Sequence, residues 1–338
     1  MSIQPVVAVG VDPHAETLSA AAVDRLGGLI WETTVPNTAE GIATLIGGTN
    51  GELWAIEGSG ALGRLLADTL RDRNVRVAEV PTRLTARLRT RGGFSKSDRI
   101  DALAIARLAL VESLPPVDHQ PIIEALRVLY RQRESLVQTQ VEAVNRIRAR
   151  LRELNTVPRL GRLRSRRQIE TIIRNLPTGE TDPHHKALIL SIRLQAEEAL
   201  QRIDRIRLLE TELANTLPPA GTRLTELPGI GLITATAIIV ATGDIRRFPT
   251  EGHYARYAGA APLDASSGRQ QRHRLNRWGN RSLNHALHTA IVTQIQQGGP
   301  AAHYVTRRLQ EGKTKKEAIR AAKTHLARHI YRLLKNLT

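Results

Sequence analysis

Four acidic residues in the first third of the chain have positions suited to metal-dependent chemistry. Asp12 directly follows an apolar, strand-like run, Val9-Gly10-Val11, and Glu57 ends another such run. Asp98 and Asp101 are three residues apart, which places them on one face of the first turn of a helix. Carboxylates that converge repel one another unless divalent cations neutralise them, and such hard oxygen ligands select Mg²⁺ or Mn²⁺.

Two such ions about 4 Å apart would stabilise the attacking and leaving oxygens of an in-line phosphoryl displacement. Each acid alone has an ordinary structural interpretation, Asp98 as a helix-dipole residue and Glu57 as a turn acid. The joint arrangement is more specific. It fits a ribonuclease H-like nuclease fold of the Holliday-junction-resolvase type.

A second reactive group lies towards the C-terminus, where Ser266 and Ser267 precede Gly268. A hydroxyl on flexible backbone can attack a phosphate, and flanking guanidinium groups can hold the scissile phosphate and stabilise its transition state. The alternative is an ordinary polar loop. The arginines that follow are Arg269, Arg272, Arg274, Arg277 and Arg281.

The N-terminal part has the pattern of an α/β domain built on a mixed sheet. Strand-like runs alternate with helical patterns after the third strand, so adjacent central strands could bring Asp12 and Glu57 together. A helix from Ser97 to Val111 would lay its two aspartates against them. Its expected apolar face is Ile100, Leu103, Ala104, Ala106 and Leu110. The expected strands are Val6–Val11, Thr17–Val23, Leu29–Val35, Leu53–Ile56 and Val75–Val80.

The rest of the chain has helical periodicity. Long helices over Pro121–Leu154 and His185–Leu217, joined by a polar, Arg-rich link, predict a helical hairpin or a dimerising coiled coil, with a plain bundle as the alternative. Beyond them we expect an all-α domain. Its Leu227–Gly231 turn resembles the phosphate-binding turn of helix–hairpin–helix modules, or is a structural turn between helices. The expected domains are 1–120, 121–217 and 218–338.

The charge balance points to a polyanionic partner. The chain has 338 residues, with 49 Lys and Arg against 32 Asp and Glu, a net charge of +17. The excess is clustered, and clustered arginines suit contacts with a nucleic-acid backbone. Aromatic residues are only 3%, which argues against membrane binding and base stacking. The predicted nucleic-acid contacts are Arg146, Arg150, Arg162, Arg166, Arg269, Arg272, Arg274, Arg277 and Arg281.

Other function classes are excluded or disfavoured. Cysteine is absent, which rules out disulfides, thiol catalysis and Cys-ligated zinc. No signal peptide or membrane span is read, so we expect a cytoplasmic, nucleoid-associated protein without a membrane partner.

Taken together, these motifs resemble the DEDD insertion-sequence transposases related to the Piv/MooV DNA invertases. The resemblance rests on Lys-Ser-Asp-Arg-Ile-Asp-Ala, Leu-Pro-Gly-Ile-Gly, and Ala-Gly-x-Ala-Pro…Ser-Ser-Gly…Gly-Asn-Arg, in the family's order. It implies a RuvC-like domain, a coiled coil and a C-terminal transposase domain. It also implies catalytic and metal-binding roles for Asp12, Glu57, Asp98 and Asp101, and a nucleophilic serine, Ser267 before Ser266. Trp278 departs from the pattern, since relatives tend to have a small residue there.

The resemblance further implies an RNA-guided DNA recombinase that excises and inserts a mobile element. Its partners would be donor and target DNA, a structured bridge RNA, Mg²⁺, and further copies of the chain in a dimer or tetramer. Two alternatives stay open. One is a metal-dependent junction nuclease that forms no covalent intermediate, and the other is a non-enzymatic architectural nucleic-acid-binding protein.

Overall fold

The computed structural model describes residues 6–49, 51–81, 84, 98–114, 116–117, 120–154, 165–261, 263–264, 273–274 and 279–337. The chain forms two compact units, Met1–His119 and Gln120–Thr338. Among the described residues, no helix has the length and apolar character needed to cross a bilayer.

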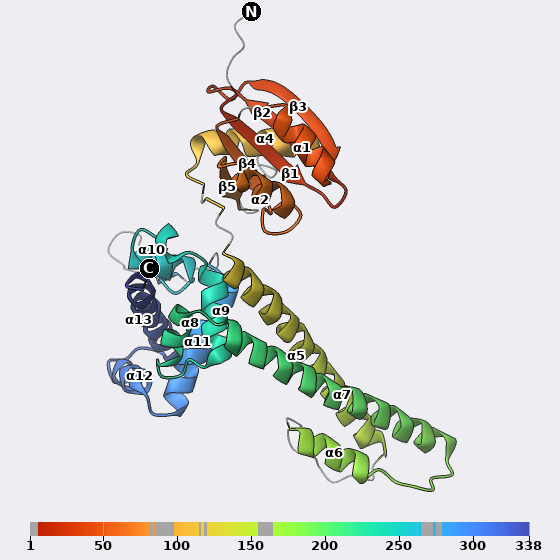
Figure 1. Ribbon diagram of the computed structural model, residues 1–338. Coiled ribbons are helices and arrows are strands. Elements are labelled where there is room, and N and C mark those ends of the chain that lie inside the picture. Colours follow the sequence, from red (N-terminus) through yellow and green to blue (C-terminus); the bar gives the residue numbers. More distant parts are fainter. Residues whose placement is uncertain are drawn as a thin grey trace, which may run out of the picture. The chain divides into compact units, whose positions relative to one another are not determined.

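The N-terminal unit is built on a five-stranded mixed sheet in the order β3-β2-β1-β4-β5 (Figure 1). Strands β1 (Ala8–Pro13), β2 (Thr17–Val23) and β3 (Leu29–Pro36) form an antiparallel meander. Strands β4 (Leu53–Glu57) and β5 (Arg76–Val80) continue the sheet, β4 parallel to β1 and β5 parallel to β4. The expected mixed sheet is therefore present, with β1 and β4 adjacent at its centre.

Helices cover both faces of this sheet. Helices α1 (Ala39–Gly47) and α2 (Arg64–Asp72) bury Ile42 and Leu66 against one face, together with Val9 and Val11 of β1. Helix α4 (Asp98–Val111) packs Ile105 against the other face, with Ala8 and Ala55. Because successive strand residues point to opposite faces, each strand contributes to both cores.

Strand β1 lies further along the chain than the hydrophobicity pattern predicts. It begins at Ala8 and ends at Pro13, so Asp12 is inside the strand and not after it. The reason is the pairing with β2, in which Asp12 lies opposite Ser19 and Pro13 opposite Leu18. The polar side chain of Asp12 thus has a fixed direction relative to the sheet.

The second unit begins with a helical hairpin. Helices α5 (Pro121–Leu154) and α7 (Pro183–Thr216) pack along each other and extend from the rest of the unit as a long arm (Figure 1). Val144, Ile147 and Leu151 of α5 share a core with Ile192 and Ala196 of α7. At the base of the arm, residues of both helices join the large C-terminal core.

Part of the link between the long helices is helical, which the polar composition did not predict. Helix α6 (Arg166–Arg174) begins with a capping box between Ser165 and Gln168, an arrangement that satisfies two otherwise unpaired backbone groups. Ile169 and Ile172 of α6 are buried against the hairpin. These apolar residues, three apart in the sequence, give the basic segment a buried face on the arm.

The C-terminal core is formed by helices around one buried cluster that includes Ile238, Tyr254, Leu287 and Ile330. Tyr254 is fully buried, and its hydroxyl is 2.9 Å from the Thr242 hydroxyl. The elements are α8 (Pro219–Thr225), α9 (Leu232–Thr242), the 3₁₀ turn η1 (Ile245–Arg247), α10 (Glu251–Tyr257), α11 (Arg281–Gln296), α12 (Pro300–Gln310) and α13 (Lys315–Lys335).

This unit is not purely α-helical, which corrects the expectation of an all-α domain. Two short strands, β6 (Leu263–Asp264) and β7 (His273–Arg274), pair antiparallel. Two-residue strands are too short for a hydrophobic periodicity to reveal them.

The Leu227–Gly231 turn joins α8 to α9, and Gly229 within it has a positive φ of 74°. A Cβ there would meet the Ala290 carbonyl of α11 at 2.5 Å. Close packing therefore requires this glycine, while phosphate binding by the turn stays a prediction.

Candidate active site

Asp12 and Glu57 lie on one face of the sheet, at neighbouring positions on adjacent strands. Val11 of β1 pairs with Ile56 of β4 in parallel register, so the next residues on the two strands are these acids. Val11 and Ile56 both point into the core beneath α1 and α2. Because side chains alternate along a strand, Asp12 and Glu57 both point to the α4 face.

Helix α4 is held unusually close to β1 at a single glycine. A Cβ on Gly10 would lie 2.3 Å from the Ala102 carbonyl oxygen and 2.2 Å from the Ala106 nitrogen. The backbone of α4 thus rests directly on β1, two residues before Asp12. Asp101 precedes Ala102 and is 9% exposed, and Asp12 is 8% exposed.

A contact near the C-terminal end of α4 shows in which direction the helix runs along the sheet. Arg107 donates from Nε to the carbonyl oxygen of Gly27, at 2.9 Å, in the turn between β2 and β3. That turn is at the end of the sheet where β1 begins, since Ala8 pairs with Val23. The first turn of α4, with Asp98 and Asp101, therefore lies towards the opposite end, where Asp12 and Glu57 are.

These acids suit a hard divalent cation by their chemistry, since all four are carboxylates. The described positions of these side chains do not form a complete metal site. Within the described part of the chain, no group of three or more acidic or histidine side chains is close enough to hold an ion. The Asp98 side chain lies outside the described residues. His14 Nε2 lies 3.4 Å from an Asp12 oxygen, so a histidine that the motif does not include neighbours the first acid.

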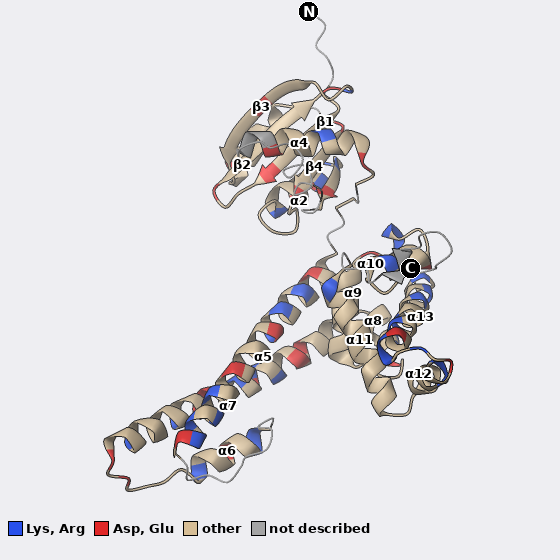
Figure 2. Ribbon diagram, turned by 180° about the vertical axis from the view of Figure 1, so that it is seen from behind, with Lys and Arg blue, Asp and Glu red and all other residues tan. Residues whose placement is uncertain are grey.

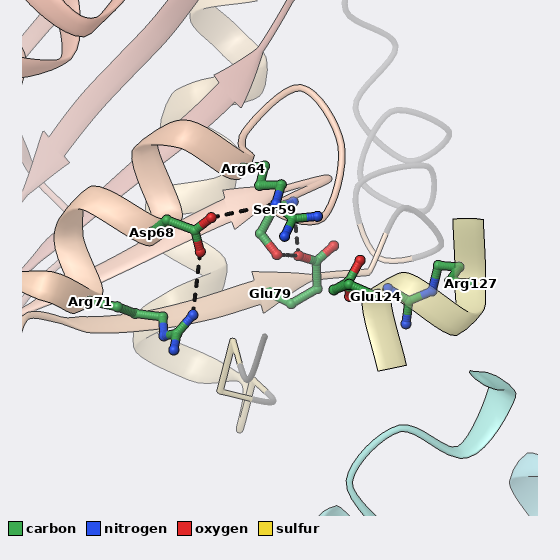
Figure 3. A network of polar contacts seen from close by, with 7 residues as sticks. All are labelled: Ser59, Arg64, Asp68, Arg71, Glu79, Glu124 and Arg127. Atoms are coloured by element: carbon green, nitrogen blue, oxygen red, sulfur yellow. Dashed lines mark hydrogen bonds and ion pairs between the residues drawn. The ribbon is translucent and has the colours of Figure 1, made fainter. Parts of the chain in front are cut away.

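A further acid, Glu79 near the end of β5, fixes the loop that follows Glu57 (Figure 3). Its carboxylate accepts hydrogen bonds from the backbone nitrogens of Gly58 and Ser59, at 3.2 and 3.0 Å, and from the Ser59 hydroxyl. Gly58 has a positive φ of 69°, the left-handed conformation that ends β4 in a sharp turn. Nearby on α2, Asp68 forms ion pairs with Arg64 and Arg71, at 3.4 and 3.3 Å.

Ser266 and Ser267 lie outside the described residues, but both ends of their segment are anchored together. A Cβ on Gly279 would lie 2.3 Å from the Gly259 Cα, so the two glycine backbones are in contact. Asn280 donates its backbone N–H to the Tyr257 carbonyl at 2.7 Å and its side-chain amide to the Tyr257 hydroxyl at 2.8 Å. The residues that flank the segment on its two sides are thus held against each other.

The predicted nucleic-acid-binding arginines have different surroundings. Arg146 on α5 and Arg281 at the start of α11 are exposed, and Arg150 is half-buried. Arg166 donates to both oxygens of Asp204, at 2.6 and 2.8 Å, and to Glu170 at 2.9 Å, and these contacts raise its pKa. Arg166 therefore holds α6 to α7. Arg162, Arg269, Arg272 and Arg277, and the side chain of Arg274, lie outside the described residues.

Known protein families match both units of the chain. Residues 9–156 match a family described as "Transposase", and residues 221–306 match the "Transposase IS116/IS110/IS902 family". The chain belongs to the IS116/IS110/IS902 transposase family. The first match contains Asp12, Glu57, Asp98 and Asp101, and the second contains the Ser266–Ser267 segment.

Relatives within this family are of moderate similarity. The chain is 34% identical over 116 residues to the "Insertion element IS110 uncharacterized 43.6 kDa protein" of Streptomyces coelicolor, covering 33% of this chain and 29% of the relative. It is 30% identical over 187 residues to a "Probable family 20 transposase" of Pseudomonas aeruginosa, covering 53% of this chain and 54% of the relative. The matches thus span about half or less of these relatives.

Among solved structures, "T. thermophilus RuvC in complex with Holliday junction substrate" is similar at 15% identity and a TM-score of 0.27. The similarity covers 33% of this chain and 99% of that one.

Two residues near the four predicted acids, Glu79 and His14, are not predicted from the sequence as part of the site. Glu79 is the last but one residue of β5, whereas Glu57 is the last residue of β4. His14 follows Asp12 by two residues and therefore points to the same side of an extended chain.

Proposed function

We propose that this protein is an insertion-sequence transposase that cleaves and rejoins DNA. The observation that supports this best is the placement of Asp12 and Glu57 on one face of adjacent parallel strands, beneath the helix that begins at Asp98. The order of the strands, 3-2-1-4-5, with the first three antiparallel, is the one expected of a ribonuclease H-like domain. We assign that fold to the N-terminal unit.

The four acids Asp12, Glu57, Asp98 and Asp101 would hold Mg²⁺ or Mn²⁺. When bound, such ions polarise a phosphate and stabilise the charge that develops on its oxygens. The chain's own contribution is positional. The sheet fixes Asp12 and Glu57, Gly10 allows α4 to approach, and Glu79 holds the turn after Glu57.

The serine segment would supply the nucleophile, Ser267 or its neighbour Ser266. Its hydroxyl oxygen attacks a DNA phosphorus, forming an O–P bond while one P–O ester bond of the strand breaks. The hydroxyl proton leaves the serine, and the released strand end takes up a proton. Reversal with a different strand end rejoins the DNA and restores the serine. Arg269, Arg272, Arg274, Arg277 and Arg281 would bind the phosphates.

The assembly is also part of the proposal. A structured bridge RNA would pair donor and target DNA, and copies of the chain would form a dimer or tetramer through the α5–α7 hairpin. The three predicted domains, 1–120, 121–217 and 218–338, would act together within it. The protein would work in the cytoplasm at the nucleoid.

A trapped adduct tests the serine step. Incubation with DNA that carries the element's ends, followed by denaturation, should leave a covalent protein–DNA species. The variants Ser267→Ala and Ser266→Ala are compared, and the nucleophile is the serine whose loss abolishes the adduct. Asp12→Ala should also prevent cleavage, while a Glu40→Ala variant on the exposed surface of α1 should not. If both serine variants still exchange strands, the covalent step is wrong.

The same experiment separates the second candidate, a metal-dependent junction nuclease. It is favoured by the placement of Asp12 and Glu57 on one face of adjacent strands, because divalent cations held by such carboxylates would suffice for hydrolysis without a protein nucleophile. A nuclease would cleave four-way DNA junctions without any adduct and would tolerate both serine variants.

A further inference from the structure

One face of the first turns of α5 carries several polar and charged side chains. They are Arg127, Tyr130, Arg131 and Glu134. The last three follow Arg127 by three, four and seven residues, and this spacing puts the four side chains side by side on a helix. Ile123 and Leu126 anchor this part of α5 in the C-terminal core. The polar face is therefore held at a fixed position beside that core.

Opposite this face, the end of α9 and the region around η1, α10 and α11 form the other wall of a cleft of about 490 Å³. Arg247, Tyr257, Asn280 and Ser282 line it, with Val240, Ala241 and Gly243 of α9. The carbonyl of Ala241 accepts hydrogen bonds from the Tyr257 hydroxyl at 3.0 Å and from Arg247 at 3.4 Å. The negative end of α9 is thereby capped.

The guanidinium of Arg247 is held in place by aromatic rings. It lies 4.6 Å from the ring centres of both Phe248 and Tyr257. Stacking of this kind fixes the plane of a guanidinium, and the N–H groups of Arg247 that do not donate to Ala241 can donate to a phosphate.

The lining of the cleft has a positive balance. Arg127 pairs with Glu124, while Arg131 and Arg247 form no ion pair with any residue that the structure describes. Glu134 is the one acid among the described lining residues. Burial, followed by the charge of Glu134, raises the pKa of Tyr130 to about 12, so Tyr130 keeps its proton and stays a donor.

The cleft adjoins the segment that carries the serines. Tyr257 and Asn280, which line it, are the residues that join the two ends of that segment. A phosphate bound between α5 and Arg247 would thus be next to Tyr257 and Asn280, which flank the Ser266–Ser267 segment.

We propose that this cleft binds a phosphodiester of the DNA strand presented to Ser266 and Ser267, with Arg131 and Arg247 as its two principal ligands. The proposal deepens the function proposed above and rests on it. It adds a phosphate site that is preformed within one unit, and its two arginines are not among the nine arginines predicted to contact nucleic acid.

Binding of a short fluorescein-labelled DNA duplex to the full chain, measured over a range of salt concentrations, tests the site. Arg131→Gln and Arg247→Gln should each weaken binding about tenfold, because each removes a charge-assisted hydrogen bond. Each should also flatten the slope of log K against log salt by about 0.9. Glu134→Gln should strengthen binding, because it removes the acid of the cleft.

Arg223→Gln is the matched control, since it changes the net charge equally. Arg223 is exposed on α8 and already paired with Glu226 at 3.0 Å, so its loss should leave DNA affinity unchanged. Equal effects of the Arg131, Arg247 and Arg223 variants would overturn the proposal, because they would reflect net charge alone.

Chemical protection of the unaltered protein gives an independent measurement. Phenylglyoxal modifies accessible arginines, and DNA should protect Arg131 and Arg247 from it, as read by mass spectrometry. DNA that binds without protecting them would overturn this site and leave the proposed function standing. Protection by an RNA of the same sequence but not by DNA would also overturn it. A wild-type protein that binds no DNA would contradict the proposed function itself.

Discussion

Two glutamates near the ends of the adjacent parallel strands β4 and β5 point to opposite faces of the sheet, because their positions in the pairing register differ by one residue. Ile56 of β4 pairs with Glu79 of β5, and Glu57 pairs with Val80. Since side chains alternate between faces, Glu57 points to the α4 face and Glu79 to the face covered by α1 and α2. Glu79 is thus a positioning residue for the turn after Glu57, on the side away from the other acids.

Replacing Glu79 with alanine should loosen that turn. The backbone nitrogens of Gly58 and Ser59 would lose their acceptor, which costs about 1–3 kcal/mol for partly buried groups. We expect a lower urea midpoint and faster hydrogen exchange of these two amides. Glu79→Gln keeps one carbonyl acceptor and should lose less. Unchanged exchange in the alanine variant would mean that Glu79 does not hold the turn.

For single residues, the sequence predicts the position of an acid along a strand better than the face of the sheet to which its side chain points. The apolar runs before Asp12 and Glu57 predict that both acids lie near strand ends, and the two do lie on adjacent strands. Glu79 was missed because Arg76-Val77-Ala78-Glu79-Val80 has no strict alternation, so the pattern cannot tell which face the glutamate occupies. Only the pairing register decides it.

At the scale of elements, the contact between α4 and β1 depends on the absence of a side chain at Gly10. Gly10→Ala should destabilise the N-terminal unit by about 1–3 kcal/mol or more, because a methyl group would overlap the helix backbone. Thermal unfolding would show this as a lower midpoint. The acids of α4 would also be displaced from Asp12, so DNA cleavage should fall.

Gly47→Ala is the control for this substitution. Gly47 is the last residue of α1, and no heavy atom lies within 4 Å of where its Cβ would be. The same chemical change there should be neutral or stabilising by up to about 1 kcal/mol. If Gly10→Ala behaves like Gly47→Ala, α4 does not lie as close to β1 as the structure has it.

The same contact explains why the buried face of α4 was predicted only in part. The apolar pattern favoured Leu103, Ala104 and Leu110, yet these are half-exposed, while Ala102 and Ile105 are buried. The helix is apolar on most sides, so hydrophobicity does not select a face. The complementary surface at Gly10 selects it, and that surface belongs to a strand about ninety residues earlier.

At the scale of the whole molecule, the two units differ in charge. Residues 1–119 contain 12 Lys and Arg against 14 Asp and Glu, whereas residues 120–338 contain 37 against 18. The entire positive excess therefore belongs to the second unit, and Figure 2 shows its Lys and Arg along α5 and α13. Affinity for a nucleic-acid backbone should follow the same division.

Separate expression of the two units tests this division, since each has hydrophobic cores of its own. After folding is checked by circular dichroism, residues 120–338 should bind a DNA duplex with nearly the salt dependence of the full chain. Residues 1–119, with a net charge of −2, should not bind it without a divalent cation, because carboxylates and phosphates repel one another. Cation-independent binding by 1–119 would contradict this division, since it would require basic residues of the first unit to hold the DNA backbone.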